Sequence, residues 1–206
     1  MGSRGSEYET EGFKHGGGGG SGKGGEKHFP VEANVRIKNK TTEGALQEFR
    51  DKHVAADHEY LYIIDDQGYV HEYDEGTASE VTFNPYNAKD ARVIHNHPSH
   101  GEPAFSFEDL DNFASGKQKS VTASSKNYDY TVERGTHFKE KEFRQALKTA
   151  KIKGHDYSDG VHNWLKDNAG KYGYKYTRTT YDDNGNAKRT YKSSTKPKGW
   201  KGSNKK

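Results

Sequence analysis

The stretch that most constrains the fold runs from residue 93 to residue 113 and reads VIHNHPSHGEPAFSFEDLDNF. Residues 91–97 have the pattern of a strand, and Pro98 predicts where that strand stops, because proline cannot donate to a sheet ladder. Ser106 then precedes an amphipathic run and is followed three residues later by Asp109, which is typical of a capped helix start. The sequence therefore predicts a strand, a loop and a helix in succession.

The surrounding pattern predicts a mixed α/β (α+β) fold in which helices flank a β-sheet. Helical spacing of apolar residues and runs of β-branched or aromatic residues mark the elements. We expect helices at 41–54 and 138–153, strands at 60–64 and 69–73 joined by the turn Asp65-Asp66-Gln67-Gly68, a short third strand at 80–83, and a hairpin over 119–135.

Glycine and charge divide the chain into three predicted parts. Residues 1–28 hold a Gly/Ser run with few apolar side chains, so we expect a flexible arm. Residues 29–154 are the predicted domain, and residues 155–206 are expected to form a short helix, a basic aromatic hairpin and a basic tail. From 171 to 206 there are eleven Lys and Arg and two Asp, a net charge of +9, which leaves about −6 for the rest of a chain of net charge +3.

Composition excludes several classes of protein. There is no cysteine, so disulfides and thiolate chemistry are excluded and a transition metal must be bound by nitrogen and oxygen ligands. No apolar run approaches the roughly 20 residues of a membrane span, and the first residues lack the apolar core of a signal peptide. We therefore expect a soluble, cytoplasmic protein with no membrane partner.

Two histidines and one aspartate form a candidate metal site. Side chains alternate along a strand, so His95 and His97 project from the same face. Asp109 falls in the first turn of the predicted helix, and the set of two nitrogens and one oxygen leaves a fourth position for water, as in a catalytic zinc site. A purely structural interpretation stays open, in which Ser106 and Asp109 only cap a helix and the histidines are ordinary core or surface residues.

These residues carry a family resemblance. HNHPSHGEPAFSFEDL resembles the signature of the JAB/MPN metallopeptidases, also called JAMM proteases, and HNHPS is especially similar to their RadC-like branch. Upstream, EYLYIIDDQGYVHEYDEGT resembles the RadC-like hairpin, in which a glutamate precedes a Gly-Thr pair by four positions. Glu72 occupies that place before Gly76 and Thr77. The resemblance covers roughly residues 55–135, and its metal motif is more specific than its hairpin.

The resemblance implies a zinc peptidase or isopeptidase in which a sheet lies between helices. His95, His97 and Asp109 would bind Zn²⁺ and activate a water. Glu72 would be the general base, and Ser106 would help to stabilise the oxyanion. The implied substrate is a peptide or protein, often with an isopeptide bond beside a ubiquitin-like tail.

The chain departs from the family pattern in one spacing. The segment from the second histidine to the aspartate is one residue longer than usual, so strict spacing would make Glu108 the ligand. We prefer Asp109, because it keeps its relation to the helix start and a loop tolerates an extra residue. Glu75 is the alternative to Glu72, although strand alternation puts these two on opposite faces. His100, in the same loop, is expected to face solvent.

The basic C-terminal region supports a second hypothesis. Tyr alternates with Lys and Arg around the turn Asp183-Asn184-Gly185, and such residues contact phosphates and stack on bases. The chain would then be a RadC-like protein associated with DNA or RNA through this region. The alternatives are a solubilising tail or a hairpin whose tyrosines pack on the domain. A third hypothesis is an interaction module without catalysis.

Overall fold

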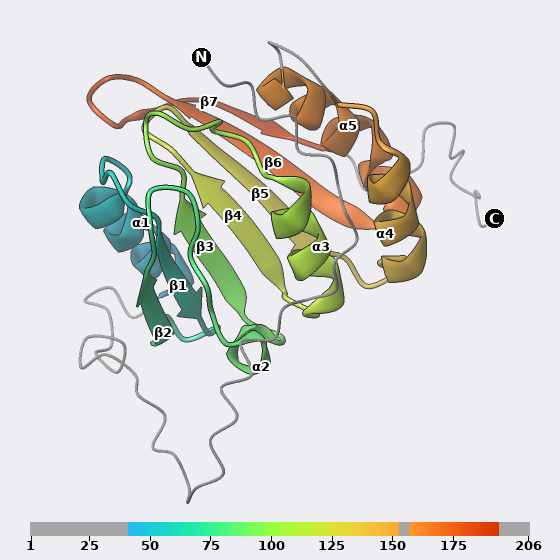
Figure 1. The fold of residues 1–206 in the computed structure, drawn as a ribbon, viewed down its shortest axis with the longest axis horizontal. Coiled ribbons are helices and arrows are strands. Elements are labelled where there is room, and N and C mark those ends of the chain that lie inside the picture. The colour runs from blue at the N-terminus through green and yellow to red at the C-terminus, as the bar shows by residue number, and fades with distance from the viewer. Residues whose placement is uncertain (1–40, 153–156, 194–206) are drawn as a thin grey trace, which may run out of the picture.

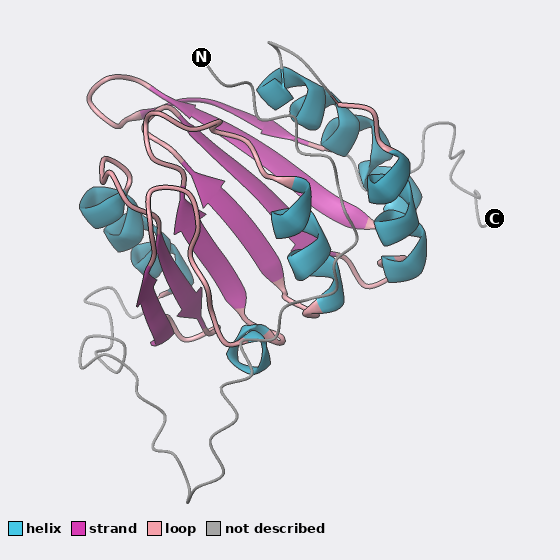
Figure 2. Ribbon diagram, in the orientation of Figure 1, coloured by secondary structure: helices cyan, strands magenta, loops and turns pink. Residues whose placement is uncertain are grey.

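The computed structural model describes residues 41–152 and 157–193, which form one seven-stranded mixed sheet and five helices (Figures 1 and 2). The predicted arm at 1–28 and the tail after residue 193 lie outside the described residues. In the part that is described, no helix has the length and apolar character required to cross a membrane. The helices are α1 (Thr42–His53), α2 (Pro85–Ala88), α3 (Phe107–Ser115), α4 (Glu140–Thr149) and α5 (Tyr157–Tyr172). The strands are β1 (Tyr60–Ile64), β2 (Val70–Glu75), β3 (Arg92–Asn96), β4 (Ser120–Ser124), β5 (Tyr128–Arg134), β6 (Tyr174–Tyr181) and β7 (Ala187–Lys192).

The strand order is β2-β1-β3-β4-β5-β6-β7, and β3 and β4 are the one parallel pair in this sheet. Parallel neighbours need a crossover, and here the crossover carries α3 across one face of the sheet (Figure 1). The end of β3 therefore leads through a loop to the start of α3. The predicted mixed α/β class is confirmed, and so is the predicted order of strand, loop and helix.

Strand alternation divides the core between the two faces of the sheet. Leu61 and Val93 lie in the larger cluster, which α3, α4 and α5 cover. Tyr62 and Ile94, one residue further along each strand, lie in the smaller cluster under α1. This period-2 division fixes the face to which every side chain near the end of β3 points.

The C-terminal elements belong to the same sheet and core as the rest. Tyr174 and Tyr176 of β6 are fully buried, and Val161 and Leu165 of α5 pack in the larger cluster with them. The helix predicted to be short has 16 residues. The predicted boundary between residues 154 and 155 thus does not separate two cores, and these two tyrosines pack on the domain.

The predicted strand at 80–83 is wrong, because this segment has irregular backbone. The Thr77 N–H donates to the Glu80 carbonyl (2.7 Å), which turns the chain back over Gly76. A Cβ at Gly76 would lie 2.0 Å from the Glu80 oxygen, so a residue without a side chain is required at this crossing. The Glu80 carbonyl is thus used in the turn rather than in a ladder.

Candidate metal centre

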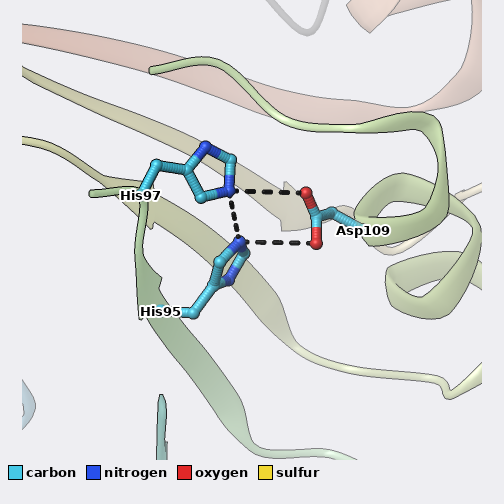
Figure 3. Close-up of side chains that lie close together, drawn as sticks. All are labelled: His95, His97 and Asp109. Atoms are coloured by element: carbon cyan, nitrogen blue, oxygen red, sulfur yellow. Dashed lines mark hydrogen bonds and ion pairs between the residues drawn. The ribbon is translucent and has the colours of Figure 1, made fainter. Parts of the chain in front are cut away.

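The side chains of His95, His97 and Asp109 converge at the end of β3 (Figure 3). The Nε2 atoms of the two histidines lie 3.0 Å apart. Asp109 Oδ1 lies 3.4 Å from His95 Nε2, and Asp109 Oδ2 lies 3.7 Å from His97 Nε2. Glu108, the alternative ligand, is exposed and is not part of this group.

The spacing of these ligand atoms fits a small tetrahedral ion. Four ligands about 2 Å from a zinc ion lie roughly 3.3 Å from one another. The two Nε2 atoms are 3.0 Å apart, Asp109 Oδ1 lies 3.4 Å from that of His95, and Asp109 Oδ2 lies 3.7 Å from that of His97, with one ligand atom from each residue within 4.8 Å of the others. Two imidazoles and one carboxylate are ligands that zinc accepts, and three protein ligands leave one position for water or substrate. The residues present therefore fit zinc.

Hydrogen bonds behind the ligand atoms orient two of the side chains. His97 Nδ1 lies 2.7 Å from the Glu102 carbonyl. Because a carbonyl can only accept, Nδ1 is the nitrogen that bears hydrogen and donates, and Nε2 of the neutral ring is left free to bind a metal. Asp109 Oδ2 accepts from the backbone N–H and from Oγ of Ser106, at 2.8 Å each. Ser106 Oγ in turn accepts from the Asp109 N–H (3.1 Å), which completes a capping box.

The group has a marked electrostatic asymmetry. Burial opposes ionisation of Asp109, but the charge and hydrogen bond of His95, the charge of His97 and the hydrogen bond of Ser106 hold its pKa well below the usual range. Burial likewise opposes a charge on His95, but Asp109 outweighs it and raises the pKa of that imidazole. Burial and the charge of His95 lower the pKa of His97. His95 is therefore the histidine that binds a proton more readily.

Glu59 is the carboxylate beside this group, and its position follows from strand register. Leu61 pairs with His95 across β1 and β3, so the same register places Glu59 opposite His97 and on the same face. Burial raises the pKa of Glu59 from 4.5 to about 7, with His95 opposing the rise and Asp109 and Glu80 adding to it. A carboxyl group with this pKa can both accept and donate a proton near neutral pH.

The structure does not bring Glu72 into the same group. Glu72 pairs with Ile63, which pairs with Val93, so its place on the sheet is one side-chain row away from His95. Its two carboxylate oxygens accept hydrogen bonds from the Asn84 N–H and from Asn87 Nδ2, both at 2.6 Å.

The other predicted residues lie around the centre. Glu75 is exposed at the end of β2, with a carboxylate oxygen 3.9 Å from His58 Nδ1. His100 is exposed as expected, and its Nε2 lies 3.3 Å from the Ala78 carbonyl. Ser106 is exposed, and its hydroxyl proton is directed at Asp109 rather than outward. Its predicted role at an oxyanion would require that hydroxyl to rotate.

Glu59 is the residue that the sequence interpretation missed. A signal for it was present, because alternation along the strand that begins at Tyr60 puts Glu59 and Leu61 on one face. The missing information was the register between β1 and β3, which decides that this face is also the face of His95.

Comparisons of the chain with protein-family models, with curated proteins and with solved structures return no match. The class defined by the fold and the site is therefore a mixed α/β protein with a His-His-Asp group suited to a metal ion.

Proposed function

We propose that the protein is a zinc-dependent hydrolase of the JAB/MPN type, RadC-like in its histidine motif, that cleaves a peptide or isopeptide bond. The observation that carries the proposal is the convergence of His95, His97 and Asp109 within 4.8 Å of one another, beside a carboxyl group whose pKa is about 7. Three ligands with an open position are typical of catalytic rather than structural zinc. A structural capping box alone would not explain two histidine nitrogens directed at the same aspartate.

The proton-transfer role in this proposal falls to Glu59 rather than Glu72. A bound zinc ion would supply a water that ionises near neutral pH and would polarise the substrate carbonyl. Glu59 accepts the proton of the attacking water and donates it to the nitrogen of the leaving amine, since its raised pKa suits both directions. Glu72 is less suited, because Asn84 and Asn87 already occupy both of its oxygens.

Metal content tests the foundation of the proposal. We expect about one zinc per chain in protein without a His tag, measured by elemental analysis. His97→Ala and Asp109→Ala should abolish binding, whereas Glu108→Ala and His100→Ala are matched controls that should retain it. A parent protein that stays metal-free in excess zinc would end the hydrolase proposal.

Hydrolysis tests the assignment of the base. With a pool of internally quenched fluorescent peptides and an isopeptide-linked ubiquitin-like substrate, Glu59→Gln should lower kcat by roughly 10²-fold or more while zinc stays bound. Glu72→Gln should retain most of the activity. The reverse ranking would return the role to Glu72, and a zinc-loaded protein inactive on every substrate would favour an interaction module.

A second candidate function, nucleic-acid binding, rests on the edge strand β7. Lys188, Arg189 and Lys192 are all exposed on it, and the sequence after residue 193 continues with five Lys and no acidic residue. β7 is the edge of the seven-stranded sheet, and exposed Lys and Arg side chains on such an edge can contact phosphates.

Salt-dependent binding to DNA and RNA oligonucleotides tests this candidate. Replacing all three basic residues of β7 by Gln should weaken binding and lower the salt slope for duplex DNA by about 3. Truncation after residue 193 should weaken it further, with zinc content unchanged as the control for folding. Binding that is absent, or unaffected by both changes, would leave the basic region without this role.

A further inference from the structure

Asn96 lies between the two histidines of the candidate centre, but its side chain points to the opposite face of the sheet. It is completely buried. Its Oδ1 accepts from the Tyr60 N–H (2.6 Å), and its Nδ2 donates to the His58 carbonyl (2.9 Å). Because a backbone N–H only donates and a carbonyl only accepts, these two partners define how the amide is oriented. Asn96 therefore holds the backbone on both sides of Glu59.

The Asn96 side chain takes the place of one backbone pair between β1 and β3. Backbone pairing between β1 and β3 ends at Leu61 and His95, and the next pair would be Tyr60 with Asn96. At that step the side chain of Asn96, not its backbone, bonds to β1. The backbone of β3 stays with β4, where the His97 N–H donates to the Ser124 carbonyl (2.7 Å). The two strands are thus linked by an amide side chain at the point where the histidines project.

The other side of Glu59 is held by the two residues that directly follow β2. The Glu59 N–H donates to the Thr77 carbonyl (2.8 Å), and the Gly76 N–H donates to the Glu59 carbonyl (2.7 Å). β2 is an edge strand and makes no contact of this kind with β3. Beyond the Leu61–His95 pair, Asn96 is consequently the residue that links the backbone around Glu59 to the strand of the histidines.

We propose that Asn96 is a positioning residue that places the Glu59 carboxyl group against the open side of the His95, His97 and Asp109 group. The inference rests on the proposed hydrolase and deepens it, since it says how the proton acceptor is held. Displacement of a catalytic group by about 1 Å can cost on the order of 10²-fold in rate. A side-chain link of two hydrogen bonds is short and buried enough to prevent such displacement.

The test compares Asn96→Asp and Asn96→Ala with a matched control, Thr122→Val. The aspartate keeps the acceptor for Tyr60 but turns an oxygen toward the His58 carbonyl, whereas alanine loses both bonds. Thr122 is also buried on the face of Asn96, and its hydroxyl lies 3.0 Å from that of Thr131, so the control loses a buried hydrogen bond away from Glu59. Metal content, kcat and KM are measured for each, alone and combined with Glu59→Gln.

We expect both Asn96 variants to bind about one zinc per chain, with KM changed less than about twofold and kcat lowered about tenfold or more. In the Glu59→Gln background the same changes should lower kcat by less than about twofold, because the residue acts through Glu59. Thr122→Val should leave kcat unchanged in both backgrounds. If the Asn96 variants lower kcat by the same factor in the Glu59→Gln background as in the parent, the inference is overturned and Asn96 has a merely structural role.

A readout without substrate separates this inference from the proposed function. In protein loaded with Co²⁺, visible absorption against pH reports ionisation at the metal. The midpoint should move in Asn96→Ala in the same direction as in Glu59→Gln, and should not move in Thr122→Val. A parent that binds no metal overturns the proposed function and the inference together, whereas a metal-bound parent with an unmoved midpoint in Asn96→Ala overturns the inference alone.

Discussion

Asp109 Oδ2 accepts hydrogen bonds from both the backbone N–H and the hydroxyl of Ser106, so one contact caps α3 and orients a candidate ligand. We predict that Ser106→Ala lowers the free energy of unfolding of the metal-free protein by about 1 kcal/mol, since a cap is lost. It should also weaken zinc binding about tenfold, because a ligand loses its support. Chemical denaturation and competition titration with a zinc chelator measure the two effects.

Ser115→Ala is the matched control for that experiment. The Ser115 hydroxyl donates to the Asp111 carbonyl (2.7 Å) in the same helix, away from the metal group. Its loss should leave zinc affinity unchanged. If Ser106→Ala alters stability but leaves zinc affinity equal to that of the control, Ser106 has no part in orienting Asp109.

Zinc affinity should fall as the pH is lowered, starting above pH 6.5. Asp109 raises the pKa of His95 in the metal-free protein, although burial opposes the rise, and zinc needs the neutral imidazole. Binding therefore releases a proton from His95 at any pH below that raised pKa, and the affinity should decrease about tenfold per pH unit there. Titrations with a zinc chelator between pH 5.5 and 8.5 measure the slope. A zinc affinity that stays constant down to pH 6 would contradict this prediction.

A buried ion pair links α1 to strand β5 of the sheet. Arg50 pairs with Asp129 and donates to Ser124 Oγ (2.9 Å), and its guanidinium lies 3.5 Å from the ring centroid of Tyr181. Asp129→Ala should lower the free energy of unfolding by about 3 to 5 kcal/mol, because it leaves a buried charge without its counterion. Urea denaturation measures the change.

The controls for the ion pair are a double variant and a more exposed pair. The double variant Arg50→Met with Asp129→Leu should be less destabilised than Asp129→Ala, since no uncompensated charge remains. Glu48→Ala, which removes a partly exposed partner of Lys52 on the same helix, should cost less than about 1 kcal/mol. Equal losses for Glu48→Ala and Asp129→Ala would refute the argument from burial.

His162 should make the protein less stable as the pH falls from 6.5 toward 4. Its Nδ1 lies 2.8 Å from the Tyr176 hydroxyl, and burial together with the charges of Arg178 and Lys166 lowers its pKa to about 4. Over this range the unfolded chain binds a proton at His162 that the folded protein does not, so stability rises with pH and is lost on acidification. After allowance for solvent screening the effect should be about 1 to 2 kcal/mol.

Thermal melts of the parent and His162→Gln between pH 4 and 7.5 test that dependence. Glutamine stays neutral and retains hydrogen-bonding capacity toward Tyr176. The variant should lose less stability between pH 6.5 and 4 than the parent. Parallel melting curves across this range would show that His162 does not titrate as expected.

Features set by near neighbours in the sequence could be predicted. The cap at Ser106 depends on a spacing of three residues, the common face of His95 and His97 on a spacing of two, and the hairpin of β1 and β2 on a short turn. The position of Glu59 opposite His97 could not be predicted in this way. It depends on the register between β1 and β3, which are separated by a hairpin, a turn over Gly76 and a short helix.

The candidate ligands are close together in the sequence, whereas Glu59 is distant from them, and this difference affects how the candidate centre assembles. His95 and Asp109 delimit a stretch of fifteen residues, so little loop-closure entropy is lost when the three candidate ligands meet. Glu59 joins them only when β1 docks on β3 from 36 residues upstream of His95. An opening of β1 from β3 would therefore separate the proposed proton acceptor from the candidate ligands and leave those ligands together. In the proposed hydrolase, ion binding and proton transfer would thus depend on contacts of different range, and a change at the β1–β3 junction would remove proton transfer without removing ion binding.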